Sequence, residues 1–212
     1  YEAVAEGVRI QKVPGHEEDL VAEALSRAGL RPPERFFTRY PYEISGGQRQ
    51  RVIIAGAMVL SPSLLVADEP VSSLDASVRG EILALMLQLA RETDLGILVV
   101  THDLGLAWNV ADRVAVMYLG RIVEEGPTEE ILTDPRHPYT RALLSVVPEI
   151  EQVEQQILTG EAPDPTRIPS GCRFHPRCPL VESGKAAKLG IEERCRGDDP
   201  RFMPACHAVS AA

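Results

Sequence analysis

The sequence is poor in lysine and contains no long apolar run. Only three lysines occur among 212 residues, and the formal net charge is −9. A general nucleic-acid binder needs clustered Lys and Arg to neutralise phosphates, so this charge balance argues against nucleic acid as a partner. No stretch approaches the roughly 20 apolar residues that span a bilayer, and no basic and apolar signal segment opens the chain. We therefore expect a soluble, cytosolic chain, and its 44% hydrophobic and 25% charged residues are ordinary for a folded protein.

Cysteine is missing from the first four fifths of the sequence. The four cysteines are Cys172, Cys178, Cys195 and Cys206. Four thiolates can hold Zn²⁺ or an iron–sulfur cluster, although the paired C-x-x-C knuckles of structural zinc are absent. In a cytosolic protein such a group more often binds metal than forms disulfides. The prolines and arginines around the first two cysteines favour a wrapping loop over a helix. A cluster, zinc and unligated thiols all stay open at this point.

The sequence also lacks a P-loop, G-x-x-x-x-G-K-[ST]. Lys185 is the one lysine that follows a glycine, but Pro179 stands at the place of the first P-loop glycine and Ala186 at that of the Ser or Thr. The backbone amides and lysine of this loop form the main cradle for a triphosphate. We therefore expect these 212 residues alone to have little affinity for ATP.

The hydrophobic pattern predicts an α/β organisation. Short, continuously apolar runs are typical of strands in a buried parallel sheet, and a helix-period segment joins the first two of them. Strand, helix and strand at this spacing predict a βαβ unit, whose ligands collect at the carboxyl ends of the strands. The predicted strands cover residues 63–67, 96–101, 113–117 and 121–124, and the predicted helices cover residues 2–11, 16–28 and 76–91.

Polar residues follow the first two predicted strands. Asp68 and Glu69 come directly after the first, and Thr101, His102 and Asp103 end the second. Adjacent carboxylates there suit a metal-assisted hydrolysis, in which the first holds Mg²⁺ and the second deprotonates a water. An imidazole at the same sheet edge could reach a γ-phosphate. Taken singly, the acidic pair also fits a solvated turn and the histidine a helix start.

Two further short segments are rich in helix-start residues. Residues 44–48 read I-S-G-G-Q and precede a helix-like run. Gly46 and Gly47 would expose amides at a helix start, where the helix dipole favours an anion. In Ser72-Ser73-Leu74-Asp75, Asp75 equally fits the N-cap of a helix.

Together, I-S-G-G-Q, L-L-V-A-D-E-P, S-S-L-D and T-H-D occur in one order with close spacing, and this constellation resembles the nucleotide-binding subunits of ABC transporters. The resemblance covers at least residues 1–148. It implies an α/β fold, a partial P-loop NTPase (ABC ATPase) domain with a helical subdomain and a cysteine-containing C-terminal extension. It also implies ATP and Mg²⁺ as cofactors. The implied roles are the signature motif for Ser45, Gly46, Gly47 and Gln48, Mg²⁺ coordination for Asp68, the catalytic base for Glu69, the D-loop aspartate for Asp75 and the switch histidine for His102.

The resemblance further implies three regions. They are a helical subdomain remnant over 1–47, the C-terminal part of the catalytic subdomain over 48–148, and an extension over 149–212 that holds the cysteines. Because family members pair head to tail, Ser45 would close over ATP held by the P-loop of the opposing subunit. The missing P-loop is then explained by a fragment of a longer ATPase or by a degenerate subunit.

A narrower resemblance rests on R-H-P-Y-T-R-A-L-L at 136–144 and on Y-P-Y-E-I-S-G-G-Q-R-Q-R, which are similar to the oligopeptide and dipeptide importer ATPases. It implies an ATP-hydrolysing subunit that energises peptide import, peripheral to the cytoplasmic face of the cell membrane. Nickel or another small solute is the competing substrate. Members that resemble this tail can carry a four-iron, four-sulfur cluster on Cys172, Cys178, Cys195 and Cys206, with Zn²⁺ as the alternative.

The same resemblance implies partners and leaves two other functions to weigh. The partners are a second ABC ATPase subunit, identical or paralogous, the transmembrane permease subunits and, indirectly, an extracytoplasmic substrate-binding protein. One alternative is a soluble ABC-type ATPase that acts on DNA or the ribosome, although such proteins usually show coiled-coil insertions or tandem cassettes. The other is a catalytically silent, metal-binding regulatory fragment, against which the presence of Glu69 and His102 argues.

Overall fold

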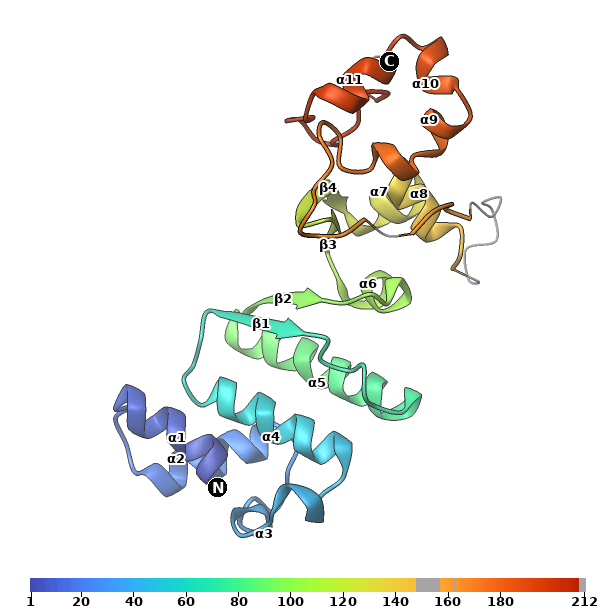
Figure 1. Ribbon diagram of the computed structural model, residues 1–212. Helices are drawn as coiled ribbons and strands as arrows, with labels where there is room; N and C mark the ends of the chain where they lie inside the picture. Colours follow the sequence, from blue (N-terminus) through green and yellow to red (C-terminus); the bar gives the residue numbers. More distant parts are fainter. Residues whose placement is uncertain (148–156, 162, 210–212) are drawn as a thin grey trace. The chain divides into compact units, whose positions relative to one another are not determined.

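A computed structural model describes residues 1–147, 157–161 and 163–209 (Figure 1). The contacts within the chain divide it into two compact units, Tyr1–His102 and Asp103–Ala212. The expected boundary after residue 47 stays a prediction, and the one at residues 148 and 149 lies outside the described residues. Within the described residues, no helix combines the length and the apolar character needed to cross a membrane.

The first unit begins with helices and ends with a parallel pair of strands. All the helices and strands predicted for this part of the sequence are present, with ends shifted by no more than two residues. Its elements are α1 (Glu2–Gln11), α2 (Glu17–Arg27), α3 (Glu34–Phe37), the 3-10 helix η1 (Pro41–Glu43), α4 (Gly46–Met58), β1 (Leu64–Asp68), α5 (Ala76–Thr93) and β2 (Gly96–Val100).

Helices α1, α2 and α4 pack against one another. Gly56 allows the close approach of α4 to α1, because a Cβ at this position would lie only 3.2 Å from the carbonyl oxygen of Ala3. The side chains buried in this helical core include Val4, Val21, Leu25 and Ile54. Burying such side chains is the main stabilising contribution to the helical part.

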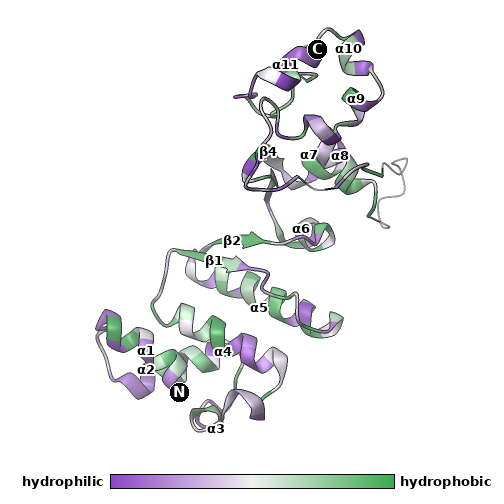
Figure 2. Ribbon diagram, in the orientation of Figure 1, coloured by the Kyte–Doolittle hydropathy of each residue, from purple (hydrophilic) through white to green (hydrophobic). Residues whose placement is uncertain are grey.

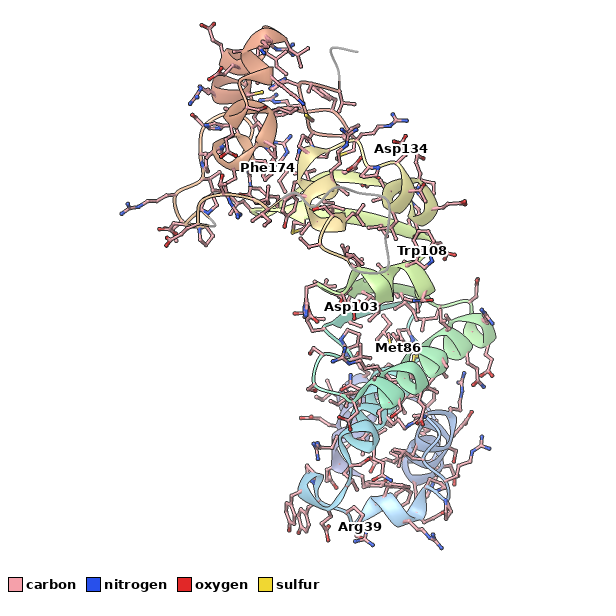
Figure 3. The ribbon with its side chains drawn as sticks, turned by 90° about the vertical axis from the view of Figure 1, so that its right-hand side faces the viewer. Arg39, Met86, Asp103, Trp108, Asp134 and Phe174 are labelled. Atoms are coloured by element: carbon pink, nitrogen blue, oxygen red, sulfur yellow. The ribbon has the colours of Figure 1, made fainter. Side chains whose placement is uncertain are left out.

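Strands β1 and β2 pair in parallel, with Leu64 opposite Gly96 and Asp68 opposite Val100. This register brings the residues that follow the two strands to the same edge of the sheet. Helix α5 connects the strands and buries one apolar stripe, which includes Met86 (Figure 3). From the helical period we expect Val78, Ile82, Leu85, Met86 and Leu89 on one face. The last four are buried, and Val78 is only partly buried.

One side of the β1–β2 sheet exposes apolar side chains. Leu64, Val66, Leu98 and Val100 are 57%, 61%, 54% and 51% exposed, and Figure 2 shows both strands as hydrophobic. Parallel sheets are normally covered on both faces. In the described part of the first unit, this face therefore resembles one side of a domain core that has no cover.

The second unit contains an antiparallel hairpin and a series of short helices. The predicted strands at 113–117 and 121–124 are confirmed, although β4 continues to Pro127. Leu119 and Gly120 form the turn between them with positive φ angles of 47° and 71°. The elements are α6 (Leu104–Val110), β3 (Arg113–Tyr118), β4 (Arg121–Pro127), α7 (Thr128–Thr133), α8 (Pro138–Leu144), η2 (His175–Arg177), α9 (Pro179–Glu182), α10 (Lys185–Lys188) and α11 (Glu192–Gly197).

Residues 172–207 pack onto the β3–β4 hairpin. Phe174 is only 1% exposed, and its ring centroid lies 5.2 Å from that of Tyr118 and 5.3 Å from that of Tyr139. The amide of Ala205 donates to the carbonyl of Val123 at 2.7 Å. The prediction of a wrapping loop around the first two cysteines is wrong in part, because the short helices η2 and α9 form there. Proline at the first positions of these helices explains the difference, since its fixed φ suits a helix start.

Candidate active site

Glu69 and His102 are in direct contact at the carboxyl edge of the β1–β2 sheet. The Nδ1 atom of His102 lies 2.6 Å from Oε1 of Glu69, and the backbone amide of His102 donates to the same oxygen at 3.2 Å. Because a carboxylate oxygen accepts, the imidazole donates through Nδ1 and leaves Nε2 for another partner. The His102 side chain is 81% exposed, so Nε2 is accessible to a ligand.

The backbone holds Glu69 in an uncommon conformation. Its φ of +45° lies in the left-handed region, which non-glycine residues seldom adopt. Its amide donates to Val100 on the neighbouring strand at 2.9 Å, and its carbonyl accepts from the Ser72 hydroxyl at 3.2 Å. Asp68 is the last residue of β1 and is exposed. The acidic pair and the histidine expected to act together are therefore at one sheet edge.

The signature segment forms the N-terminus of α4. Ser45 is the N-cap: its hydroxyl accepts from the Gln48 amide at 3.2 Å, while Oε1 of Gln48 accepts from the Ser45 amide at 3.0 Å. This reciprocal pair is a capping box. The first amides of a helix have no carbonyl acceptor within the helix, and the helix dipole makes this end favourable for an anion.

The two signature glycines lie against the beginning of α5. A Cβ on Gly47 would approach Cγ1 of Val78 to 2.6 Å, and one on Gly46 would lie 3.3 Å from Cδ2 of Leu74. A side chain on Gly47 would force Val78 to shift, and one on Gly46 would make a tight contact with Leu74, so packing as well as phosphate binding favours glycine here. Asp75 occupies the N-cap position of α5 but makes no side-chain capping bond. The capping role weighed for its carboxylate is thus not used in this structure.

Two arginines in this region were missed by sequence reasoning. The guanidinium of Arg79 donates to the Leu74 carbonyl at 2.8 Å and so holds the turn before α5. Arg51 bonds to both α2 and α5. Its position three residues after Gln48, on the same side of the helix, is the one sequence signal that could have indicated its involvement.

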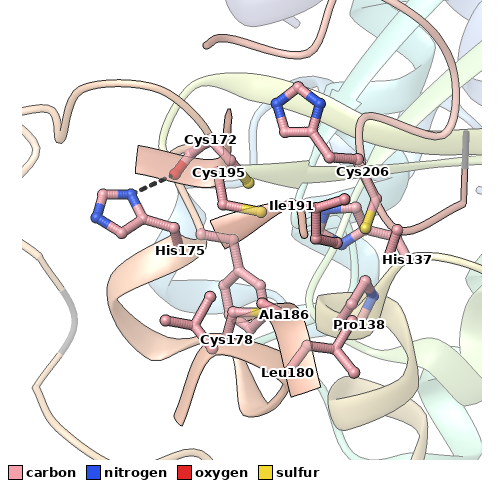
Figure 4. Close-up of a pocket in the computed structure, with 14 residues that line it drawn as sticks. His137, Pro138, Cys172, His175, Cys178, Leu180, Ala186, Ile191, Cys195 and Cys206 are labelled. Carbon is pink, nitrogen blue, oxygen red and sulfur yellow. Dashed lines mark hydrogen bonds between the residues drawn. The ribbon is translucent and has the colours of Figure 1, made fainter. Parts of the chain in front are cut away.

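All four cysteines lie in the second unit, and their side chains line one small cavity (Figure 4). The cavity volume is about 10 Å³, and the lining also includes Phe174. The thiols are free. In the described part of the chain, no three His, Cys, Asp or Glu residues are arranged to hold a metal ion. The structure thus gathers the predicted sulfur donors without forming a closed ligand set.

Burial determines the electrostatics of these thiols. It raises the pKa of Cys172 and that of Cys195 to about 11, with a smaller upward contribution from neighbouring thiols. Burial also raises the pKa values of Cys178 and Cys206. Neutral thiols are therefore favoured where no cation is bound, and a bound cation would have to displace their protons.

The H-P-Y-T-R-A-L-L segment is anchored in the same unit. Glu124 is only 3% exposed. Its carboxylate accepts hydrogen bonds from the backbone amides of Arg136 at 2.6 Å and His137 at 3.1 Å. His137 caps α8 through Nδ1, which accepts from the Tyr139 amide at 3.1 Å. Burial lowers the pKa of His137 to about 4. The segment therefore serves as an anchored helix start that borders the cysteine cavity.

Known structures with a similar fold are ABC ATPases. CbiO1 of Clostridium perfringens, part of an ABC transporter complex, is 32% identical with a TM-score of 0.53, over 62% of this chain and 51% of that one. The ATP-binding cassette of another ABC transporter, solved in its ADP conformation, is 28% identical with a TM-score of 0.50, over 58% and 49%. The fold that the chain shares with these structures thus defines the class as an α/β ABC ATPase.

Sequence comparison identifies the family. Residues 2–72 match the family described as ABC transporter, and residues 123–184 match the C-terminal region of oligopeptide/dipeptide transporters. The dipeptide transport ATP-binding protein of Haemophilus influenzae is 46% identical over 86% of this chain and 53% of its own length. The oligopeptide transport ATP-binding protein of Bacillus subtilis is 44% identical over 90% and 58%. The chain belongs to the ATP-binding proteins of peptide ABC transporters, and it spans about half the length of these relatives.

Proposed function

We propose that the chain is part of an ATP-hydrolysing subunit that energises peptide import. The observation that carries this proposal is the contact between Glu69 and His102 beside Asp68. Glu69 would deprotonate the attacking water, and Nε2 of His102 would contact the γ-phosphate. Asp68 would hold Mg²⁺, which supplies charge neutralisation for phosphoryl transfer. A single exposed carboxylate suits this ion, because Mg²⁺ commonly takes one or two carboxylates and completes its ligands with water and phosphate.

Ser45 would contact an ATP molecule that is bound by the P-loop of an opposing subunit. The α4 N-terminus offers the amides of Gly46 and Gly47 and the Ser45 hydroxyl as donors for the γ-phosphate. These 212 residues contain no P-loop, so this donor set completes a site only when a P-loop from elsewhere is present. Asp75, whose carboxylate makes no capping bond, would lie at the same interface between subunits.

The uncovered sheet face supports a further component in the complete subunit. We infer that a P-loop-containing segment covers Leu64, Val66, Leu98 and Val100. Covering four half-exposed aliphatic side chains would remove apolar surface from water at about 25 cal/mol per Å². The half-length match to relatives leaves enough of their chains to supply such a cover.

The family supports a proposal for the substrate class, the other partners and the location. The match over residues 123–184 and the names of the relatives support oligopeptides or dipeptides as the transported class. The partners would be a second ABC ATPase subunit, permease subunits and, through them, an extracytoplasmic substrate-binding protein. The subunit would then be peripheral to the cytoplasmic face of the membrane.

ATP hydrolysis by the complete, assembled transporter tests this proposal. Replacing Glu69→Gln should abolish peptide-stimulated hydrolysis while nucleotide binding persists, because the amide keeps the shape of the side chain but cannot act as the base. Glu92→Gln changes an exposed carboxylate on α5 and is the matched control. Retention of full hydrolysis by Glu69→Gln would contradict the assignment.

We further propose that Cys172, Cys178, Cys195 and Cys206 ligate a four-iron, four-sulfur cluster. Four thiols that line one cavity provide the donor chemistry for a cluster. A cavity of about 10 Å³ has room for about one water molecule at most, so these residues would have to move apart around a cluster.

Anaerobically purified protein should show an absorbance band near ~400 nm. The band should disappear in Cys178→Ser and persist in Ser183→Ala, which changes a neighbouring hydroxyl. If the purified protein is colourless and holds stoichiometric zinc, the cluster assignment is wrong and the four cysteines form a zinc site.

A further inference from the structure

Arg51 joins three helices of the first unit. One guanidinium nitrogen, Nη1, donates to the carbonyl of Ala28 at 3.0 Å, and the other, Nη2, lies 3.2 Å from Oε2 of Glu81. Ala28 is the C-cap of α2, Arg51 belongs to α4 and Glu81 to α5. The Arg51 side chain is 20% exposed, whereas that of Glu81 is 63% exposed. The arginine thus reaches through the helical part to the surface of α5.

Both ends of this bridge suit a guanidinium. The last carbonyls of a helix have no partner within it and carry the negative end of the helix dipole, so a cation at Ala28 is favoured. The planar fork of arginine donates in two directions at once, which the single ammonium of lysine does less well. Gly29 makes room for it: this residue has a φ of +80°, and a Cβ there would lie 2.6 Å from Nη1.

The bridge lies one helical turn from the signature motif. Arg51 follows Gly47 by four residues, so the two share one side of α4. Gly47 fits tightly against Val78, and Glu81 follows Val78 by three residues on α5. Two contacts, one helical turn apart, therefore hold the start of α4 against the first turns of α5. The first is the close contact of Gly47 with Val78, and the second is the ion pair of Arg51 with Glu81.

The first turns of α5 also fix Asp75. Asp75 is the N-cap of α5, and Arg79 holds the preceding turn through the Leu74 carbonyl. Movement of α4 along α5 would consequently change the separation between Ser45 and Asp75, the two residues proposed to meet the nucleotide and the opposing subunit.

We propose that Arg51 is a positioning residue that sets the signature helix against the start of α5, so that Ser45 and Asp75 keep the spacing needed for hydrolysis. This rests on the proposed function for its catalytic part. Its structural part concerns the first unit alone, and the two parts can be tested separately.

The structural part is tested by amide hydrogen exchange on the 212-residue chain. In Arg51→Gln, amides at the end of α2 and in the first turns of α5 should exchange roughly fivefold faster or more, because local opening no longer has to break the bridge. Peptides from the second unit should be unchanged. Arg91→Gln, which changes an exposed arginine near the far end of α5, should match the original chain. Unchanged exchange in Arg51→Gln would overturn the proposal.

The catalytic part is tested in the complete transporter that contains this subunit. Arg51→Gln should lower kcat on the order of tenfold to a hundredfold, as expected for a misplaced donor, and leave KM for ATP within about twofold because the P-loop is untouched. Glu81→Gln should lower kcat in the same direction. Arg51→Lys should recover only part of the loss, because an ammonium cannot reproduce the two-directional fork.

A destabilising control separates positioning from loss of stability. Ile82→Val removes one buried methyl group from α5 without touching the bridge, at an expected cost of stability but not of kcat. A normal kcat in Arg51→Gln would overturn the positioning role. The role would also be overturned if Arg51→Gln and Ile82→Val lower Tm equally and Arg51→Gln loses no more kcat than Ile82→Val. If the original assembly shows no hydrolysis at all, the proposed function fails instead, and the exchange experiment still decides whether the bridge exists.

Discussion

Replacing Phe174→Ala should strongly destabilise the second unit. Phe174 is among its most buried side chains at 1% exposed, and its ring contacts Tyr118 edge-on while lying 5.7 Å from the ring of His137. It therefore connects residues near the cysteines with the β3–β4 hairpin and with α8. One substitution within residues 172–207 should therefore weaken the whole unit.

The expected magnitude follows from the burial. Removing a fully buried phenylalanine ring costs about 3 to 5 kcal/mol, which combines lost burial with the cavity left behind. Each favourable aromatic pair contributes about 0.5 to 1.5 kcal/mol beyond its buried area, so we expect the upper part of that range. A domain of this size is stabilised by about 5 to 15 kcal/mol, so a loss of this size removes a large share of the stability of the unit.

Urea unfolding followed by Trp108 fluorescence is a suitable assay. Trp108 is the only tryptophan and lies on α6, in the same unit but far along the chain from residue 174. With an m value of about 1 to 3 kcal/mol per M, the midpoint should fall on the order of 2 M. Phe202→Ala is the matched control, because that ring is 38% exposed and should cost much less.

A transition at Trp108 that does not move in Phe174→Ala would refute this reasoning. It would mean that residues 172–207 unfold independently of the hairpin, whatever their contacts in the folded state. A shift of equal size in Phe202→Ala would also contradict it, since the effect would then not follow burial.

Three other predictions concern the nucleotide motifs and the anchored histidine. Ser45→Arg should abolish hydrolysis in the assembled transporter but leave ATP binding to each complete subunit largely intact, and loss of binding by the isolated subunit would contradict the composite site. The 212-residue chain alone should show little Mg²⁺-dependent ATP binding in titration calorimetry, and tight binding would show that a cradle other than a P-loop exists. Burial lowers the pKa of His137 from 6.5 to about 4 because it disfavours the charged imidazole, so acid should cost the folded state about 3 kcal/mol relative to the unfolded chain. This cost is absent above pH 6.5 and grows as the pH falls toward 4. In metal-free, reduced protein, urea midpoints between pH 7 and 4 should fall more steeply than in His137→Asn, which keeps a capping oxygen but does not titrate; equal slopes would sink the assignment.

The elements that the sequence predicted well are those with a clear hydrophobic period. The buried stripe of α5 is long enough to be recognised over several turns, and the apolar runs of β1 and β2 are typical of a parallel sheet. Their parallel register follows from the connecting helix and places Glu69 and His102 at the same edge. The 2.6 Å contact between them is a finer result, because it depends on the left-handed φ of Glu69, which no sequence pattern indicates.

The structure of the tail was beyond the reach of periodicity. Helices α9 and α10 have four residues each and α11 has six, so none is long enough to show a repeating apolar face. Their arrangement depends on contacts between distant residues, such as Ala205 with Val123 and Phe174 with Tyr118. Arg51 was missed for a similar reason: its partner Glu81 lies thirty residues further along the chain.

The Ser45 segment shows that two interpretations of one motif can both hold. The S-x-x-Q spacing fits a capping box as well as a phosphate site, and the structure contains the capping box. In it the Ser45 hydroxyl accepts from the Gln48 amide, which uses one lone pair of the oxygen and leaves its O–H as a donor. The capping bond also fixes the side-chain rotamer, so this O–H is held at the helix start before any nucleotide arrives. Capping by Ser45 therefore prepares the donor that the opposing nucleotide would need, and Ser45→Ala should lose both the cap and the donor, whereas Gln48→Ala should weaken only the cap and retain more of the hydrolysis rate.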